Sequence, residues 1–135
     1  MGWRDLVQVE QPQEFWVDLP QLGPGYRLAF RPPSVAMVWD AFLDAQQHPP
    51  EGVPYPLSGI LLCFARCLVD AHPPLDIPAT DLILGLATHP QHNEAFGALL
   101  QAWVERVPEL FRFQQEVEEG KSGGPLASSG QRRQP

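Results

Sequence analysis

Two cysteines and two histidines come nearest, in type and spacing, to a metal site in this 135-residue chain. Cys63 and Cys67 lie one helical turn apart, and His89 and His92 are three residues apart. Together the four side chains could supply the tetrahedral Cys₂His₂ ligand set of zinc. However, both cysteines fall in an apolar stretch that predicts a helix, where free cysteine behaves as a small hydrophobic residue. The histidines flank Pro90 in a polar linker, so we favour solvated histidines over metal ligands.

The other chemical motifs are incomplete. Gly120-Lys121-Ser122 ends like a phosphate-binding loop, but Gln115 stands where that motif needs its first glycine. No serine lies in a Gly-x-Ser-x-Gly context, and a buried thiol near His72 would be inert because burial raises its pKa. Asp40 and Asp44 share a helix face, which is typical of a solvated acidic stripe. The sequence therefore predicts a protein that is not an enzyme and that needs no metal or cofactor.

Charge and composition divide the chain into a body and a tail. All 16 acidic residues lie in residues 1–119, where six arginines leave a net charge of −10. The tail, residues 120–135, carries Lys121, Arg132 and Arg133 and is otherwise rich in Gly, Ser, Pro and Gln. Such a tail buries too little apolar surface to order itself, so we expect it to be disordered. The acidic body repels phosphate, which argues against binding to nucleic acid.

No membrane segment or signal peptide is expected from the pattern of apolar residues. Residues 1–10 lack a positive region followed by an apolar run, and the longest apolar stretch, residues 59–69, is interrupted by Arg66. A membrane-spanning helix needs about 20 apolar residues. We therefore expect a cytoplasmic protein whose two cysteines are reduced.

Residues 14–31 predict a β-hairpin. Every second residue in each strand belongs to one apolar face. In the first strand these residues are Phe15, Val17 and Leu19, and in the second they include Tyr26 and Phe30. Residues 20–25 between them supply two glycines and two prolines for the turn. Because two strands alone are only marginally stable, the hairpin must lie on helices or pair with another chain.

Four helical segments follow, so the predicted fold is mainly α with a small N-terminal β-hairpin (α+β), in one domain of about four helices. Ser34 is the expected N-cap of the first helix, which should end before His48. The second helix is expected at about residues 57–71, and the third at residues 81–87 with Thr80 as its N-cap. The fourth is expected to have Asn93 as its N-cap and to end or kink at Pro108. Residues 109–119 could continue it as a helix. The first helix should bury one face, made of Val35, Val38, Trp39, Phe42 and Leu43.

Large aromatic residues are numerous for so small a core. Trp16 stands on the hairpin face opposite Phe15, so one layer cannot bury both, and Phe111 and Phe113 follow Pro108 on a projecting segment. An apolar patch with an acidic surround is typical of a protein–protein interface. The alternative is that these residues complete the core.

The order of elements resembles the tail assembly chaperones of long-tailed bacteriophages, in their short form. The resemblance covers residues 14–119 and is carried by an arrangement of elements, not by a motif. Those elements are a hairpin (residues 17–31), a helix after Arg31-Pro-Pro-Ser34, a hydrophobic helix ending in residues 62–70 (LCFARCLVD), a short helix (residues 81–87), a longer amphipathic helix (residues 92–107) and a Glu-rich end.

Glu119-Gly120-Lys121 is a second, independent point of similarity. Such chaperones are commonly made in two lengths by ribosomal slippage near the end of the first reading frame, and a familiar slippery stretch encodes Gly-Lys. Lys121 is the single lysine of a chain with eight arginines. The alternative is a chance Gly-Lys dipeptide.

The resemblance implies a non-catalytic helper that acts in the host cytoplasm and is absent from the mature virion. Its partners would be the tape-measure protein, tail-tube subunits and copies of itself, the last through the hairpin edge. The residues expected at these contacts are aromatic: Phe15, Trp16, Tyr26, Phe30, Trp39, Trp103, Phe111 and Phe113.

Two other functions stay open. A small structural or adaptor subunit, such as a head–tail connector component, would persist in the mature particle. A small zinc-binding regulator would use the cysteine and histidine pairs.

Overall fold

The structure is a computed structural model that describes residues 2–7, 13–112 and 115. Phe113 and the predicted tail, with Gly120-Lys121, lie outside the described residues. The described elements, in chain order, are α1 (Trp3–Val7), β1 (Phe15–Asp18), β2 (Arg27–Phe30), α2 (Val35–Gln47), α3 (Leu57–Cys67), β3 (Leu68–His72), α4 (Ala79–Thr88), the 3₁₀ turn η1 (Pro90–His92) and α5 (Asn93–Arg106). The predicted α+β class, with four helices of useful length after a hairpin, is confirmed.

The sheet is antiparallel, in the order β1-β2-β3. β1 and β2 form the predicted hairpin, in which Phe15 pairs with Phe30 and Val17 pairs with Leu28. β3 pairs with the other edge of β2, with Leu28 opposite Ala71. β3 therefore occupies one edge of the hairpin, that of β2, whereas β1 is an edge strand of the described sheet.

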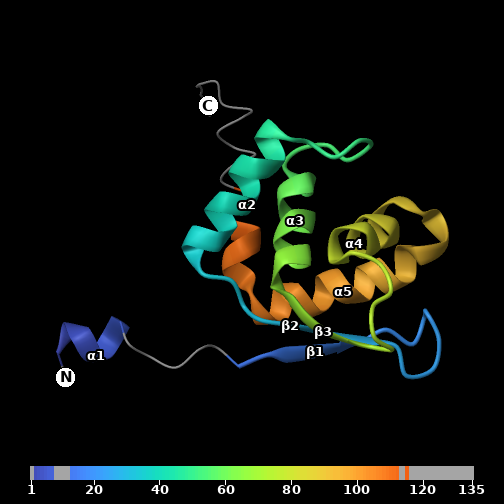
Figure 1. Cartoon of the computed structure of the whole chain (residues 1–135), viewed down its shortest axis with the longest axis horizontal. Helices are drawn as coiled ribbons and strands as arrows, with labels where there is room; N and C mark the ends of the chain where they lie inside the picture. The colour runs from blue at the N-terminus through green and yellow to red at the C-terminus, as the bar shows by residue number, and fades with distance from the viewer. Residues whose placement is uncertain (1, 8–12, 113–114, 116–135) are drawn as a thin grey trace, which may run out of the picture.

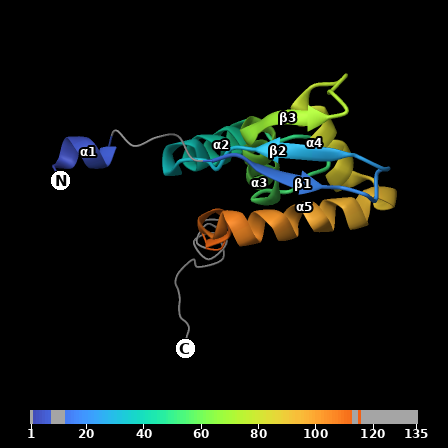
Figure 2. The same ribbon diagram turned by 90° about the horizontal axis from the view of Figure 1, so that it is seen from below.

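The fold has two layers. Figure 1 shows α2, α3, α4 and α5 on one face of the sheet, and Figure 2 shows α5 lying beside β1. In the described part of the chain, no helix covers the opposite face of the sheet, which is turned toward the viewer in Figure 2. Alternation along the strands sends Phe15 and Val17 into the core and leaves Trp16 and Asp18 on the open face.

An aromatic cluster fills the space between the layers. Phe15 and Phe30 meet the indole of Trp103 edge-on, with ring centroids 5.6 Å and 5.3 Å from it, and Phe64 stacks on the same indole. Edge-to-face and offset contacts of this kind add to the stabilisation from area burial alone. The strands, α3 and α5 therefore share one continuous core.

The buried face of α2 differs from the predicted one. Val38 and Phe42 are buried as expected, but the other buried positions are Ala41 and Ala45, whereas Val35, Trp39 and Leu43 are exposed. The reason is the close approach of α2 to α3. At Gly59 of α3 an added Cβ would lie 2.6 Å from the Phe42 ring, so the contact needs small residues on the facing surfaces.

The second predicted helix, over residues 57–71, is too long. α3 ends at Cys67, and Leu68–His72 continue as β3. After Cys67 the main chain pairs with the second edge of β2. Next to this edge, the backbone N–H of Arg31 donates to the carbonyl of Cys67 at 2.9 Å. Ladder bonds with β2 thus outweigh the helical pattern of the apolar residues, since buried backbone groups must be paired.

Helix ends follow the predicted signals in part. Ser34 caps α2 by accepting a hydrogen bond from the N–H of Met37 at 3.2 Å, as predicted. Thr80 is not a cap, because α4 already begins at Ala79 after Pro78, and Asn93 is the first residue of α5. α5 ends at Arg106, and residues 108–112 form a further helical turn that begins at Pro108.

Candidate docking surface

Three of the aromatic residues predicted to contact a partner lie in the core instead. Phe15, Phe30 and Trp103 have exposed fractions of at most 3%, because strand alternation and α5 direct their side chains between the two layers. Their rings contact one another and leave no surface on which a partner could pack. We therefore treat these three as core residues and exclude them from the docking surface.

The exposed members of the predicted set lie on three separate surfaces. Trp16 is on the open sheet face, where the guanidinium of Arg27 sits 4.4 Å from its ring centroid. Trp39 is on α2, and Tyr26 stands at the start of β2. Phe111 is half-buried against the core, and Phe113 lies outside the described residues. The fold therefore does not gather these aromatic residues into one patch.

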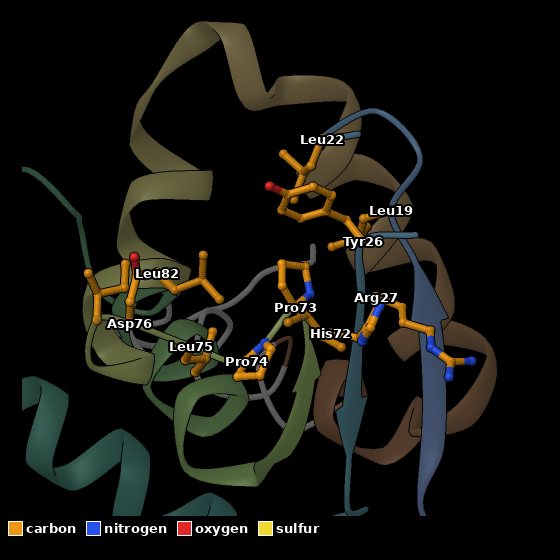
Figure 3. A pocket seen from close by; sticks show the side chains of 12 residues that line it. Leu19, Leu22, Tyr26, Arg27, His72, Pro73, Pro74, Leu75, Asp76 and Leu82 are labelled. Atoms are coloured by element: carbon orange, nitrogen blue, oxygen red, sulfur yellow. The ribbon is translucent and has the colours of Figure 1, made fainter. Parts of the chain in front are cut away.

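One of these surfaces contains a cavity of about 290 Å³, which we call the hairpin pocket. Its walls come from the hairpin turn, the connector between β3 and α4, and α4 itself. Figure 3 shows Tyr26 and Leu22 on one side, Leu75 and Leu82 on the other, and Pro73 and Pro74 between them. Polar lining groups are few: the side chains of Arg27, His72 and Asp76 and the hydroxyl of Tyr26. A concave, mainly apolar surface with a few polar groups is suited to receive apolar side chains of a partner.

Local backbone geometry places Tyr26 at this pocket. The connection between β1 and β2 is closed by the N–H of Leu19, which donates to the carbonyl of Tyr26 at 2.9 Å. Inside it, Gly23 adopts a φ of +146° that other residues rarely adopt, and an added Cβ there would lie 2.8 Å from Cε1 of Tyr26. The glycine therefore lets the tyrosine ring lie directly against the turn.

The opposite wall is held by prolines. Pro73 and Pro74 precede Leu75, and Pro78 follows Ile77, so the backbone of this six-residue connector has little freedom. Leu75 and Ile77 are nevertheless 39% and 46% exposed. Apolar side chains held outward by a stiff backbone lose little entropy when they are covered by a partner.

Sequence reasoning missed Leu75 and Ile77 because it concentrated on aromatic residues. The signal was present: two aliphatic residues stand between three prolines, where no helix or strand could bury them by its own periodicity.

A second depression, which we call the α2 groove, lies between the start of α2 and the helical turn after Pro108. It has a volume of about 400 Å³. Its floor is apolar and its rim carries two charges; the lining residues are Pro33, Val35, Val38, Trp39, Val107, Glu109, Leu110 and Arg112. Val35 is 71% exposed, whereas Leu110 is fully buried. The groove therefore combines an accessible wall with a firmly packed base.

The two cysteines and two histidines that could have formed a metal site do not come together in the described part of the structure. Within residues 2–7, 13–112 and 115, no three His, Cys, Asp or Glu side chains come together as metal ligands. Cys63 and Cys67 are buried, whereas the rings of His89 and His92 are 6.3 Å apart near the surface. The Cys₂His₂ set considered above is therefore not formed by the described residues.

The two thiols instead interact with each other. Cys63 donates a hydrogen bond to the sulfur of Cys67, which raises the pKa of Cys63, and burial raises it further. The same hydrogen bond lowers the pKa of Cys67, with help from the charge of Arg31 and against the effect of burial. Both side chains have exposed fractions of only 1%, so neither sulfur is accessible to a substrate.

Comparisons with protein-family models, with curated proteins and with solved structures found no match. Among the described helices, none has the length and apolar character needed to cross a bilayer.

Proposed function

We propose that this chain is a non-catalytic tail assembly chaperone of a long-tailed bacteriophage. In this role it covers apolar stripes of the tape-measure protein and helps to recruit tail-tube subunits. The proposal combines the order of elements and the Gly120-Lys121 dipeptide with one structural observation, which is the exposed apolar hairpin pocket.

The hairpin pocket supports a binding role because its exposed residues are apolar and its frame is stiff. Tyr26, Leu75 and Ile77 are each about 40% exposed or more. Side chains from one face of an amphipathic helix, spaced by three and four residues, would be covered by such a surface. An acidic chain of net charge −7 would also keep such a complex soluble in a crowded assembly.

The binding part of the proposal is tested by co-expression with the long helical protein encoded near this gene. Alone, that protein should be insoluble; with this chain it should be recovered in a soluble complex. Ile77→Ser should lower the recovered complex several-fold, since an apolar contact is lost. Val104→Ser in α5, at a residue with the same 46% exposure, is the matched control and should leave recovery unchanged. Equal losses from both variants would remove the hairpin pocket from the proposal.

The identity of the chaperone is tested separately, through its products. The native gene is expressed with its downstream DNA and probed with an antibody to the body. A second, larger product that disappears after a synonymous change at the Gly120-Lys121 codons is the expected result. A single product of about 15.1 kDa would argue against this chaperone family while leaving a binding role intact.

A further inference from the structure

The N-terminal helix α1 carries an apolar face that no other described residue covers. Trp3, Leu6 and Val7 are spaced by three and four residues and so share one side of the helix. Trp3 is 84% exposed, and no residue of α1 is buried. Both views show α1 standing apart from the two-layer body (Figures 1 and 2).

The α2 groove offers a matching surface. Its accessible wall, Val35, is 71% exposed, and Val38 and Leu110 give it a packed apolar base. The groove has a volume of about 400 Å³, and the side chains of Trp3, Leu6 and Val7 together are small enough to fit in it. The exposed apolar side chains of α1 could therefore pack on the apolar lining of this groove.

Charges on the two surfaces are complementary. Arg4 lies in α1 between the apolar positions, and Glu109 lies on the groove rim. Neither takes part in an ion pair among the residues that the structure describes. Arg112 lies on the same rim and Asp5 lies next to Arg4 in α1, so a docked α1 would place Arg4 toward Glu109 and Asp5 toward Arg112.

Each chain presents α1 and the α2 groove without bringing them together. Residues 8–14 separate Val7 from Phe15, and seven residues reach at most about 24 Å when fully extended. That reach is enough to deliver α1 beyond the surface of its own body. We infer that α1 of one copy docks in the α2 groove of a second copy, so that copies associate head to tail.

This contact differs from a symmetric dimer interface. The helix α1 of one copy and the groove of the next are different surfaces, so every added copy offers a new groove. The copies then form a closed ring or an open filament, depending on the rotation that relates one copy to the next. A single docked helix of five residues buries far less than the roughly 1,200 Å² of a stable interface, so each contact should be weak and association should depend on concentration. The inference does not depend on the proposed chaperone function.

The decisive experiment is cross-linking with the full chain. A benzophenone amino acid replaces Val35 in the groove, and ¹⁴N-labelled and ¹⁵N-labelled protein are mixed before illumination. The expected cross-link joins position 35 to residues 2–7, with mixed isotopes, which identifies a second copy. If both cross-linked peptides always carry the same isotope, α1 docks in the groove of its own chain. If position 35 is cross-linked to residues 113–119, the C-terminal segment occupies the groove. Either of those results would overturn the inference.

Sedimentation of variants provides an independent test. Trp3→Ala should weaken self-association roughly tenfold or more, as for an aromatic anchor residue. Val35→Asp should do the same, and because Val35 is exposed in the first turn of α2, aspartate there should not unfold the helix. Leu43→Asp is the matched control, since Leu43 is an exposed apolar residue of α2 outside the groove. Loss of association with Leu43→Asp alone, or a wild-type chain that is monomeric at every concentration, would overturn the inference.

Charge reversal tests the specific pair. Arg4→Glu and Glu109→Arg should each weaken association several-fold, and the double variant should return to within about twofold of the wild type. Additive losses in the double variant would show that Arg4 and Glu109 do not meet.

Discussion

The ring of Phe64 in α3 stacks on the indole of Trp103 in α5, with ring centroids 4.3 Å apart and planes inclined by 25°. Phe15 and Phe30 contact the same indole from the sheet. Trp103 is therefore the residue at which the sheet layer and the helix layer meet, and its side chain is fully buried.

Truncation of Trp103 should be among the most damaging single changes. Trp103→Ala is expected to lower the free energy of unfolding by about 3–5 kcal/mol, since it leaves a large cavity. Trp103→Phe keeps an aromatic ring at this position and removes an Nε1–H that has no hydrogen-bond partner among the described residues. The free energy of unfolding should therefore fall by less in this variant, by about 1–2 kcal/mol. Urea denaturation followed by far-UV circular dichroism measures both values. Equal losses would mean that a phenyl ring cannot replace the packing of the indole at this position.

Arg66 links α3 to α2 through two carboxylates. It forms ion pairs with Asp40 and with Asp44, and the side chain of Asp44 is 38% exposed whereas that of Asp40 is 80% exposed. Solvent screens such pairs, so Arg66→Met should lower stability by no more than about 0.5–1 kcal/mol. A double-mutant cycle with Asp44→Asn should show the larger coupling, and one with Asp40→Asn should be near zero. Coupling that persists unchanged in 1 M salt would contradict an ion-pair origin.

The cysteine pair predicts a loss of stability at high pH. In the unfolded chain both thiols ionise near their ordinary pKa of about 9, whereas in the fold the hydrogen bond and burial raise the pKa of Cys63 far above this. Cys67, with its lowered pKa, ionises first in the fold. Above about pH 9 the unfolded chain has therefore released two protons and the folded chain one, so stability falls as pH rises.

The magnitude follows from one proton: about 1.4 kcal/mol for each pH unit above the ordinary thiol pKa. Thermal unfolding between pH 8 and 10.5 measures this slope. The double variant Cys63→Ala, Cys67→Ala should lose less stability over the same range, and Tyr55, whose pKa is raised by burial, is present in both proteins and cancels. Parallel slopes for the two proteins would rule out the cysteines as the cause.

Local signals in the sequence were sufficient for much of the fold. Alternation of apolar residues predicted the hairpin, and Ser34 marked the start of α2, because both depend on residues close in the chain. β3 could not be found in this way. Its strand conformation depends on the unpaired edge of β2, about 40 residues earlier in the chain, while its own residues continue the apolar pattern of α3.

The exposed surface was harder to predict than the core. The buried face of α2 is set by Gly59 on α3, a contact between helices that the periodicity of α2 alone does not contain. The same shift exposes Val35 and Trp39, which form the α2 groove. The hairpin pocket likewise needs the turn and the connector to meet in space, so only Tyr26 of its exposed residues was anticipated.

Two glycines should respond in opposite ways to the same substitution. Gly23→Ala places a Cβ about 2.8 Å from the Tyr26 ring and forces alanine into a φ of +146°, so it should lower stability by about 1 kcal/mol or more and move the ring out of the hairpin pocket. Gly97→Ala in the middle of α5 meets no atom within 4 Å and should raise stability by about 0.5–1 kcal/mol. Urea denaturation gives the two signs. Aromatic and methyl NMR shifts of Tyr26, Leu22 and Leu75 should change only with Gly23→Ala, and unchanged shifts would mean that the glycine does not position this ring.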